Sequence, residues 1–331
     1  MPRPTASRRL WIRAAQGVFS ALLLVYLIRL VDWPRVSTLA RSGVVWALWP
    51  GPLILLAGLL MAAQRWHLVL AFFGVSLGRL EALRLYLTGA FYGVLLPGVL
   101  GGDTVRVALC RARTGASLSP IIASVAIERG LGLWGVALIG TIGAFSIAPA
   151  LRSTVGPFVL WIALALALSA PLAFLVALRG SGFALRLLRA HLVRDWAPSL
   201  ATSLEGTVAQ LRSLPWGLTL KTLLISTLFQ SSEIFVFSYF GSLLGIEAPF
   251  AFYVFVVPLI YLSTVVPISL GGVGVREGVL VWMLAKIGVP ASTGVLLAFL
   301  AYLNRIAVAL IGGGAQFLSS SRRTEAPPQS P

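Results

Sequence analysis

Charged residues are scarce in this sequence, and their scarcity excludes a water-soluble fold. They make up 11% of the 331 residues, whereas hydrophobic residues make up 58% and the mean hydropathy is +0.93. Soluble globular domains carry about 25% charged and 45–50% apolar residues. Runs of about 20 apolar residues recur along the chain, and each is long enough to cross a hydrocarbon core roughly 30 Å thick. The sequence therefore predicts an all-α polytopic membrane protein.

Cysteine and histidine are almost absent as well. The single cysteine, Cys110, excludes an internal disulfide and any site built from a cluster of cysteines. The two histidines, His67 and His191, are too few and too far apart in sequence for a histidine-based metal centre. The sequence also contains no Walker motif and no nucleophile–base pattern. We therefore predict no cofactor, no metal and no ATP-driven step.

Acidic residues are few, which leaves the chain strongly basic. Lysine and arginine number 26 against 10 acidic residues, so the formal net charge is +16. The basic residues sit between the apolar runs rather than on one soluble face. Membrane topology and lipid headgroups therefore explain them better than nucleic acid does. We predict membrane lipids as partners and no nucleic acid.

The apolar runs organise the chain into one membrane domain over residues 17–317. A basic N-terminus, 1–16, precedes the first run without a cleavage site and is predicted to be cytoplasmic. The arginine-rich loop 179–216 is predicted to be cytoplasmic, and the tail 318–331 is predicted to be disordered. The predicted segments are 17–30, 43–63, 83–101, 119–148, 155–178, 217–244, 249–270, 278–289 and 294–317.

Counting the crossings between basic loops indicates two re-entrant hairpins. If the loop after 155–178 is cytoplasmic, segment 83–101 must begin and end on the same side of the membrane, since Arg65 and Arg79 also lie inside. A hairpin broken at Pro97-Gly98 satisfies this, provided that its irregular backbone is buried in protein or lines a wet cavity. The same count makes 249–289 a second hairpin, broken at Pro258 and Pro267. This predicts about seven or eight crossings.

The two predicted hairpins carry related motifs. One reads Pro-Gly-Val-Leu-Gly-Gly-Asp-Thr-Val-Arg over 97–106, and the other reads Pro-Ile-Ser-Leu-Gly-Gly-Val-Gly-Val-Arg-Glu over 267–277. Pro, Gly, Gly and Arg recur at one offset of 170 residues, which predicts an inverted internal repeat. Broken helices at a repeat interface are where secondary transporters bind substrate, and Arg106 or Arg276 would strengthen an anion site there. Alternatively, the glycines permit close helix packing and the arginines reach the membrane interface.

These residues also carry a resemblance to a known family. The motifs at 96–106 and 267–277, with Ser-Val-x-x-Glu-Arg at 124–129 between them, resemble the lysylphosphatidylglycerol synthase transmembrane-region, or flippase-like, family over residues 15–315. The resemblance implies a lipid-handling protein of the bacterial inner membrane. Its best-studied relatives move aminoacylated phosphatidylglycerol between leaflets. No soluble domain follows residue 317, so we expect no aminoacyl-transferase activity. Other relatives are linked to isoprenoid, glycolipid or hopanoid pathways, so the lipid stays open.

Several charges and aromatic residues fall inside or beside apolar segments. Ionised groups in a membrane usually face the protein interior and pair with one another. We predict that Asp103 or Glu128 pairs with Arg276 or Arg305 across the repeat interface. Because neighbours on a helix point about 100° apart, Glu128 and Arg129 should have different partners. An interfacial belt is predicted from tryptophans near segment ends, at Trp46, Trp49, Trp66, Trp161 and Trp216.

The leading prediction is a lipid translocase without catalytic residues that moves a polar, aminoacylated or glycosylated lipid between leaflets of the inner membrane. The predicted partners are anionic, aminoacylated or isoprenoid-linked membrane lipids. The first alternative is a membrane-embedded transferase that modifies a lipid, with Asp103 and Glu277 as acids. The second is a non-catalytic scaffold for a lipid pathway, or a purely structural charge network. The predicted substrate-binding residues are Pro97, Gly101, Gly102, Asp103, Arg106, Glu128, Arg129, Pro267, Gly271, Gly272, Gly274, Arg276 and Glu277.

Overall fold

A computed structural model describes residues 44–96, 101–147, 213–264 and 272–324, with a few isolated positions before and between these ranges and side chains up to Gly314. All regular secondary structure in these ranges is helical. The helices are α3 Val44–Ala47, α4 Pro50–Phe72, α5 Arg79–Leu95, α6 Gly101–Thr114, α7 Leu118–Ser146, α12 Trp216–Leu243, α13 Phe250–Ser263, α14 Val275–Ala285 and α15 Ala291–Thr324.

Four of these helices are long and apolar enough to cross a membrane: α4, α7, α12 and the part of α15 over Ala291–Gly314. They correspond to the predicted segments 43–63, 119–148, 217–244 and 294–317. The first prediction has the wrong end, because α4 continues past Arg65 to Phe72. The chain is therefore a helical membrane protein, while the total number of crossings stays a prediction.

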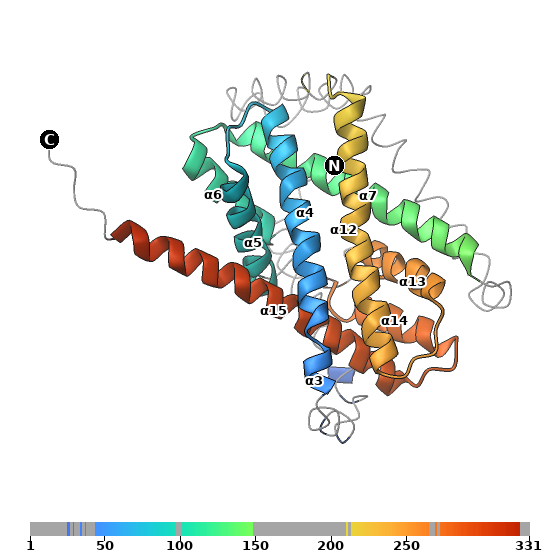
Figure 1. The fold of residues 1–331 in the computed structure, drawn as a ribbon. Helices are drawn as coiled ribbons and strands as arrows, with labels where there is room; N and C mark the ends of the chain where they lie inside the picture. Colours follow the sequence, from blue (N-terminus) through green and yellow to red (C-terminus); the bar gives the residue numbers. More distant parts are fainter. Residues whose placement is uncertain are drawn as a thin grey trace, which may run out of the picture.

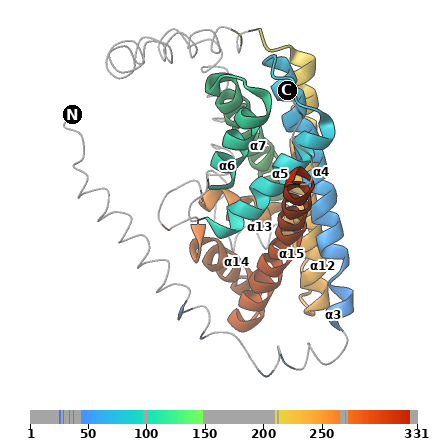
Figure 2. The ribbon, with the colours of Figure 1, turned by 90° about the vertical axis from the view of Figure 1, so that its left-hand side faces the viewer.

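The long helices pack in pairs drawn from the two halves of the chain. Helix α4 lies along α12, and both views show the two side by side (Figures 1 and 2). Helix α15 packs against α5, and α7 packs against both α12 and α13. The first half and the second half of the sequence are thus interleaved, which places side chains from distant segments next to one another.

The first broken pair consists of α5 and α6, which pack against each other. A methyl group on Gly102 would overlap the carbonyl oxygen of Gly89, so the glycine allows the two backbones to touch. The predicted hairpin 83–101 is too short, because its second arm extends to Thr114. That arm carries one acidic and several basic residues, and hydropathy alone did not identify it. The break itself, with Pro97, lies outside the described residues.

The second broken pair consists of α13 and α14. The prediction that Pro258 breaks the segment is wrong, since Pro258 lies buried inside α13. Its ring packs against α7, where a methyl group on Gly140 would come within 3.0 Å of the Pro258 Cβ. The helix ends instead at Ser263. The predicted break at Pro267 lies outside the described residues.

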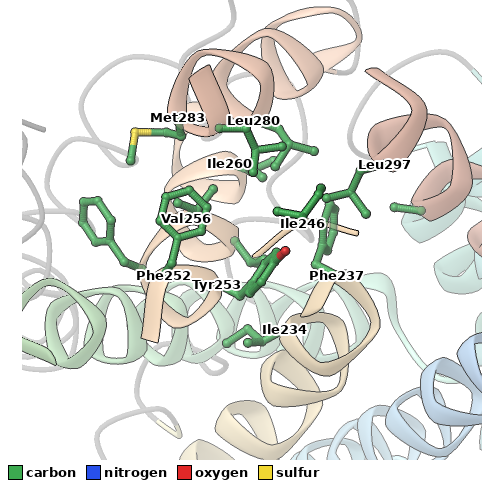
Figure 3. Packing of buried hydrophobic residues seen from close by; sticks show 14 of the residues in the cluster. Ile234, Phe237, Ile246, Phe252, Tyr253, Val256, Ile260, Leu280, Met283 and Leu297 are labelled. Atoms are coloured by element: carbon green, nitrogen blue, oxygen red, sulfur yellow. The ribbon is translucent and has the colours of Figure 1, made fainter. Parts of the chain in front are cut away.

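Two separate hydrophobic clusters stabilise the fold. One joins α4, α5, α6 and α7 and includes Trp66, Leu70, Cys110 and Ile121. The other joins α12, α13, α14 and α15 with the end of α7, and Figure 3 shows side chains of these helices converging around Tyr253 and Val256. Each cluster contains one of the broken pairs. A charged network lies beside each of them.

Several predictions fall outside the described residues. These are the N-terminus 1–16, most of the span 17–30, the span 155–178, most of the loop 179–216, and the end of the tail. Helix α15 continues to Thr324 and so extends into the stretch 318–331 that we expected to be disordered.

Candidate functional site

The first network is centred on Glu128 of α7, which is 3% exposed. One carboxylate oxygen accepts hydrogen bonds from Arg65 Nη2 and from the Tyr86 hydroxyl, both at 2.6 Å. The other oxygen accepts a bond from Arg106 Nη2 at 2.7 Å. A buried carboxylate in a membrane protein is costly unless it is paired. Glu128 therefore holds α4, α5, α6 and α7 together at a single point.

Arg106 of α6 is held by aromatic rings as well as by carboxylates. Its guanidinium carbon lies 4.5 Å from the ring centroids of both Trp66 and Tyr86. It also forms an ion pair with Asp103, one turn earlier on α6, at 3.2 Å. Away from water such cation–π contacts are worth about 2 kcal/mol or more. Trp66 is fully buried and donates a hydrogen bond to Ser124 at 3.0 Å.

Arg129 connects this network to the surface. Its side chain is 52% exposed, and its Nη2 lies 2.5 Å from Asp103 Oδ2. Glu128 and Arg129 thus have different partners, as the helical spacing predicted. The first network consists of Arg65, Tyr86, Asp103, Arg106, Glu128 and Arg129. It contains three guanidinium groups and two carboxylates.

The second network lies among α12, α13, α14 and α15 and consists of Glu233, Tyr261, Arg276, Glu277 and Arg305. Arg305 Nη2 donates to Glu233 Oε1 at 3.0 Å and also contacts the Tyr261 hydroxyl. On α14, Glu277 Oε1 accepts hydrogen bonds from Arg276 Nε at 3.0 Å and Nη2 at 2.7 Å. Glu277 Oε2 accepts the backbone N–H of Gly274 at 2.7 Å.

A small pocket, open in part to the outside, adjoins the second network. Its charged lining consists of Arg276, Glu277 and Arg305, and its remaining lining is aromatic or apolar: Phe237, Ile260, Leu280, Ala298, Ala301 and Tyr302. The ring of Tyr302 lies 5.8 Å from the Arg276 guanidinium. The pocket therefore offers positive charge beside apolar surface.

The predicted pairing across the repeat is wrong. Asp103 and Glu128 pair with Arg65, Arg106 and Arg129, whereas Arg276 and Arg305 pair with Glu277 and Glu233. Each network balances most of its charge within its own half of the structure. The predicted residues therefore divide into two groups instead of lining one cavity.

The two motif copies also differ in backbone conformation. In the first copy, Gly101 and Gly102 already belong to α6. In the second copy, Gly272 and Gly274 have φ values of 78° and 86°, which residues other than glycine rarely adopt. Helix α14 therefore begins only at Val275. As a result, Arg106 lies well inside its helix while Arg276 lies in the first turn of α14. Pro97, Pro267 and Gly271 lie outside the described residues.

Sequence reasoning missed some contributors and misplaced others. Arg65 was expected at a membrane boundary and Trp66 in an interfacial belt, but Arg65 is buried in the first network and Trp66 is buried beside it. Trp46, Trp49 and Trp216 are exposed, as a belt requires. Tyr86, Tyr261 and Tyr302 were not singled out, and no local signal marks them. Their partners lie far away in sequence.

Among the described residues, no group of three or more His, Cys, Asp or Glu side chains could hold a metal ion. The acids are instead engaged with arginines. The two networks present charged and hydrogen-bonding groups.

The model of the lysylphosphatidylglycerol synthase TM region matches residues 13–313. The chain belongs to this family. This match confirms the resemblance seen in the motifs. Both networks and the pocket lie within the matched residues. No curated protein and no solved structure matches the chain.

Proposed function

We propose that this protein is a lipid translocase of the bacterial inner membrane and that the pocket beside the second network binds the lipid headgroup. The observation that supports this most directly is the pocket lining, in which Arg276 and Arg305 lie among apolar side chains. Arginine is the residue best suited to a phosphate group because its guanidinium donates two parallel hydrogen bonds. A lipid presents such a phosphate next to apolar chains.

The pocket is partly open, so only a headgroup would contact Arg276 and Arg305 there. The acyl chains would stay in the bilayer while the headgroup passes through the protein. Because the sequence contains no Walker motif, we propose that the movement uses a lipid or ion gradient.

The first network would have a different task in the same process. Asp103, Arg106 and Glu128 would hold the first broken pair in place. Arg129, with its half-exposed side chain, is the member that a lipid phosphate could reach. We further propose that the α5–α6 and α13–α14 pairs form an inverted repeat within about seven or eight crossings, as their shared motif indicates.

The proposal is tested by identifying the lipids that co-purify with the full-length protein in mild detergent, by mass spectrometry. We expect one class of phosphate-containing lipid to be enriched, and an Arg276→Ala variant to lose that enrichment. Arg84→Ala is the matched control, because Arg84 is 51% exposed and lies 3.6 Å from Glu81 on the surface. Melting curves of all three proteins check folding.

A second measurement tests movement rather than binding. Purified protein is placed in liposomes that contain a fluorescent derivative of the enriched lipid, and quenching by an impermeant reductant reports its transfer between leaflets. We expect transfer with wild type and with Arg84→Ala, and slower transfer with Arg276→Ala. If all variants co-purify with the same lipids and none transfers lipid between leaflets, the protein is better explained as a non-catalytic scaffold. Chemical conversion of the lipid would favour the transferase.

A further inference from the structure

Arg276 and Glu277 are neighbours in sequence, and their pairing is unusual for a helix. Side chains at positions i and i+1 point about 100° apart and do not face each other. Yet both Nε and Nη2 of Arg276 donate to Glu277 Oε1, at 3.0 and 2.7 Å. The pairing arises because Glu277 turns back to accept the Gly274 N–H at 2.7 Å. The carboxylate thus lies where the guanidinium and the start of α14 both reach it.

The groups that hold this carboxylate are also the groups that bind phosphate. A guanidinium fork and a backbone N–H at a helix N-terminus are typical phosphate ligands. Of these donors, the Arg276 guanidinium lines the pocket, whose charged lining consists of two arginines and a single carboxylate, that of Glu277. Glu233, which pairs with Arg305, does not belong to the lining. An anion in the pocket therefore meets one carboxylate as its direct competitor.

We propose that the Glu277 carboxylate is an internal competitor for the lipid phosphate, and that the two anions exchange on Arg276 during each passage. This inference rests on the proposed function of the pocket. Arg276 and Glu277 are 17% and 15% exposed, so the released carboxylate can reach water at the edge of the pocket. A translocase must release its lipid as readily as it binds it, and a returning carboxylate lowers the affinity for the phosphate.

The alternative is that Glu277 serves only as a helix cap. Glutamine is equally suited to that position of a capping box, since its side-chain oxygen also accepts the N-cap N–H. A Glu277→Gln variant therefore keeps the cap and removes the competing charge. Glu277→Asp keeps the charge but is one methylene shorter, so it cannot bridge Arg276 and Gly274 in the same way. Both variants should bind anionic lipid more tightly than wild type if Glu277 competes.

The experiment measures binding of dioleoyl phosphatidylglycerol, dioleoyl phosphatidylcholine and dioleoylglycerol to the purified full-length protein in detergent. We expect Glu277→Gln to bind the anionic lipid about fivefold to tenfold more tightly than wild type. This is the change expected when one charge-assisted hydrogen bond no longer competes for Arg276. Dioleoylglycerol, which has no phosphate, should not respond. Glu247→Gln is the matched control, because Glu247 is an exposed acid between α12 and α13.

The outcomes separate this inference from the proposed function. In one outcome wild type prefers the phospholipids, Arg276→Ala loses that preference, and both Glu277 variants bind like wild type. Competition by Glu277 is then overturned, while lipid binding in the pocket is supported. If the Glu277 variants bind more weakly, Glu277 is a ligand of the lipid and the inference is also overturned. If wild type and Arg276→Ala bind all three lipids equally, the proposed function itself fails.

Discussion

Arg106 and Arg276 occupy the same place in motifs 170 residues apart, yet the structure surrounds them differently. Arg106 is buried, contacts two aromatic rings and shares Glu128 with Arg65. Arg276 pairs with its neighbour at the edge of a pocket. The first network ties four helices together, whereas the pair on α14 ties α14 only to itself. The same motif thus places a buried arginine, Arg106, in one half and a pocket-lining arginine, Arg276, in the other.

The cause of the difference lies in the backbone of the glycines. Gly102 is helical and is pressed against Gly89, so α6 begins early and carries Arg106 into the interior. Gly272 and Gly274 have positive φ, so α14 begins one turn later and Arg276 stays near its start. A shared sequence motif therefore does not guarantee a shared environment.

The largest expected effect comes from removing the centre of the first network. Glu128→Ala leaves Arg65 and Arg106 buried without their common carboxylate, which should destabilise the fold by about 3–5 kcal/mol. The measurement is thermal unfolding in detergent, followed by size-exclusion chromatography. The paired variant is Glu277→Ala, which loses one cap and should cost only about 1 kcal/mol. An equal loss of stability in both variants would show that the two networks contribute equally to the fold.

A methyl group between the arms of the first broken pair should have the next largest effect. Gly102→Ala forces α5 and α6 apart, because the new methyl overlaps the Gly89 carbonyl, and should cost about 1–3 kcal/mol. Gly93→Ala on the same interface is the control. Its methyl would lie 3.8 Å from Gly102 Cα, an ordinary contact. Melting temperatures that fall equally for both would show that the close approach is unimportant.

A smaller effect is expected at Trp66. Trp66→Phe keeps a ring beside Arg106 but removes the hydrogen bond to Ser124, which should cost about 1 kcal/mol. Trp216→Phe should leave the melting temperature unchanged, since Trp216 is exposed. A larger shift at Trp216 than at Trp66 would contradict the burial of Trp66 beside Arg106.

The smallest effect on stability is expected at the exposed end of the first network. Arg129→Ala removes a half-exposed ion pair, worth about 1 kcal/mol or less. If Arg129 meets the lipid, transfer in liposomes should slow by about threefold, which corresponds to about 0.6 kcal/mol. Unchanged transfer would confine lipid recognition to the pocket, and abolished transfer would extend it to the first network.

The sequence predicted the long helices well and their charge partners poorly. Segments 119–148 and 217–244 agree closely with α7 and α12, because uninterrupted hydropathy depends only on local composition. Segment 43–63 ended too early because Arg65 was taken for a boundary charge. The carboxylate that permits its burial, Glu128, lies 63 residues away in sequence.

The candidate site was predicted in part for the same reason. The repeated motif identified Asp103, Arg106, Arg276 and Glu277 as residues in unusual surroundings. It could not show that they form two networks, because the grouping depends on how α4, α5, α12 and α13 are interleaved. The tyrosines that complete both networks were missed, since an isolated tyrosine in an apolar run is typical of any buried helix.

The pairing of Arg276 with its own neighbour has a mechanical consequence. Among the described residues, no ion pair joins α14 to another helix, whereas α6, α7 and α15 are each tied to a second helix by one. Moving α14 would break apolar contacts and the loose ring contact with Tyr302, but it would leave no charge behind in the bilayer. Helix α14 is therefore short, and its two charges neutralise each other. It can move without breaking an ion pair between the other described helices.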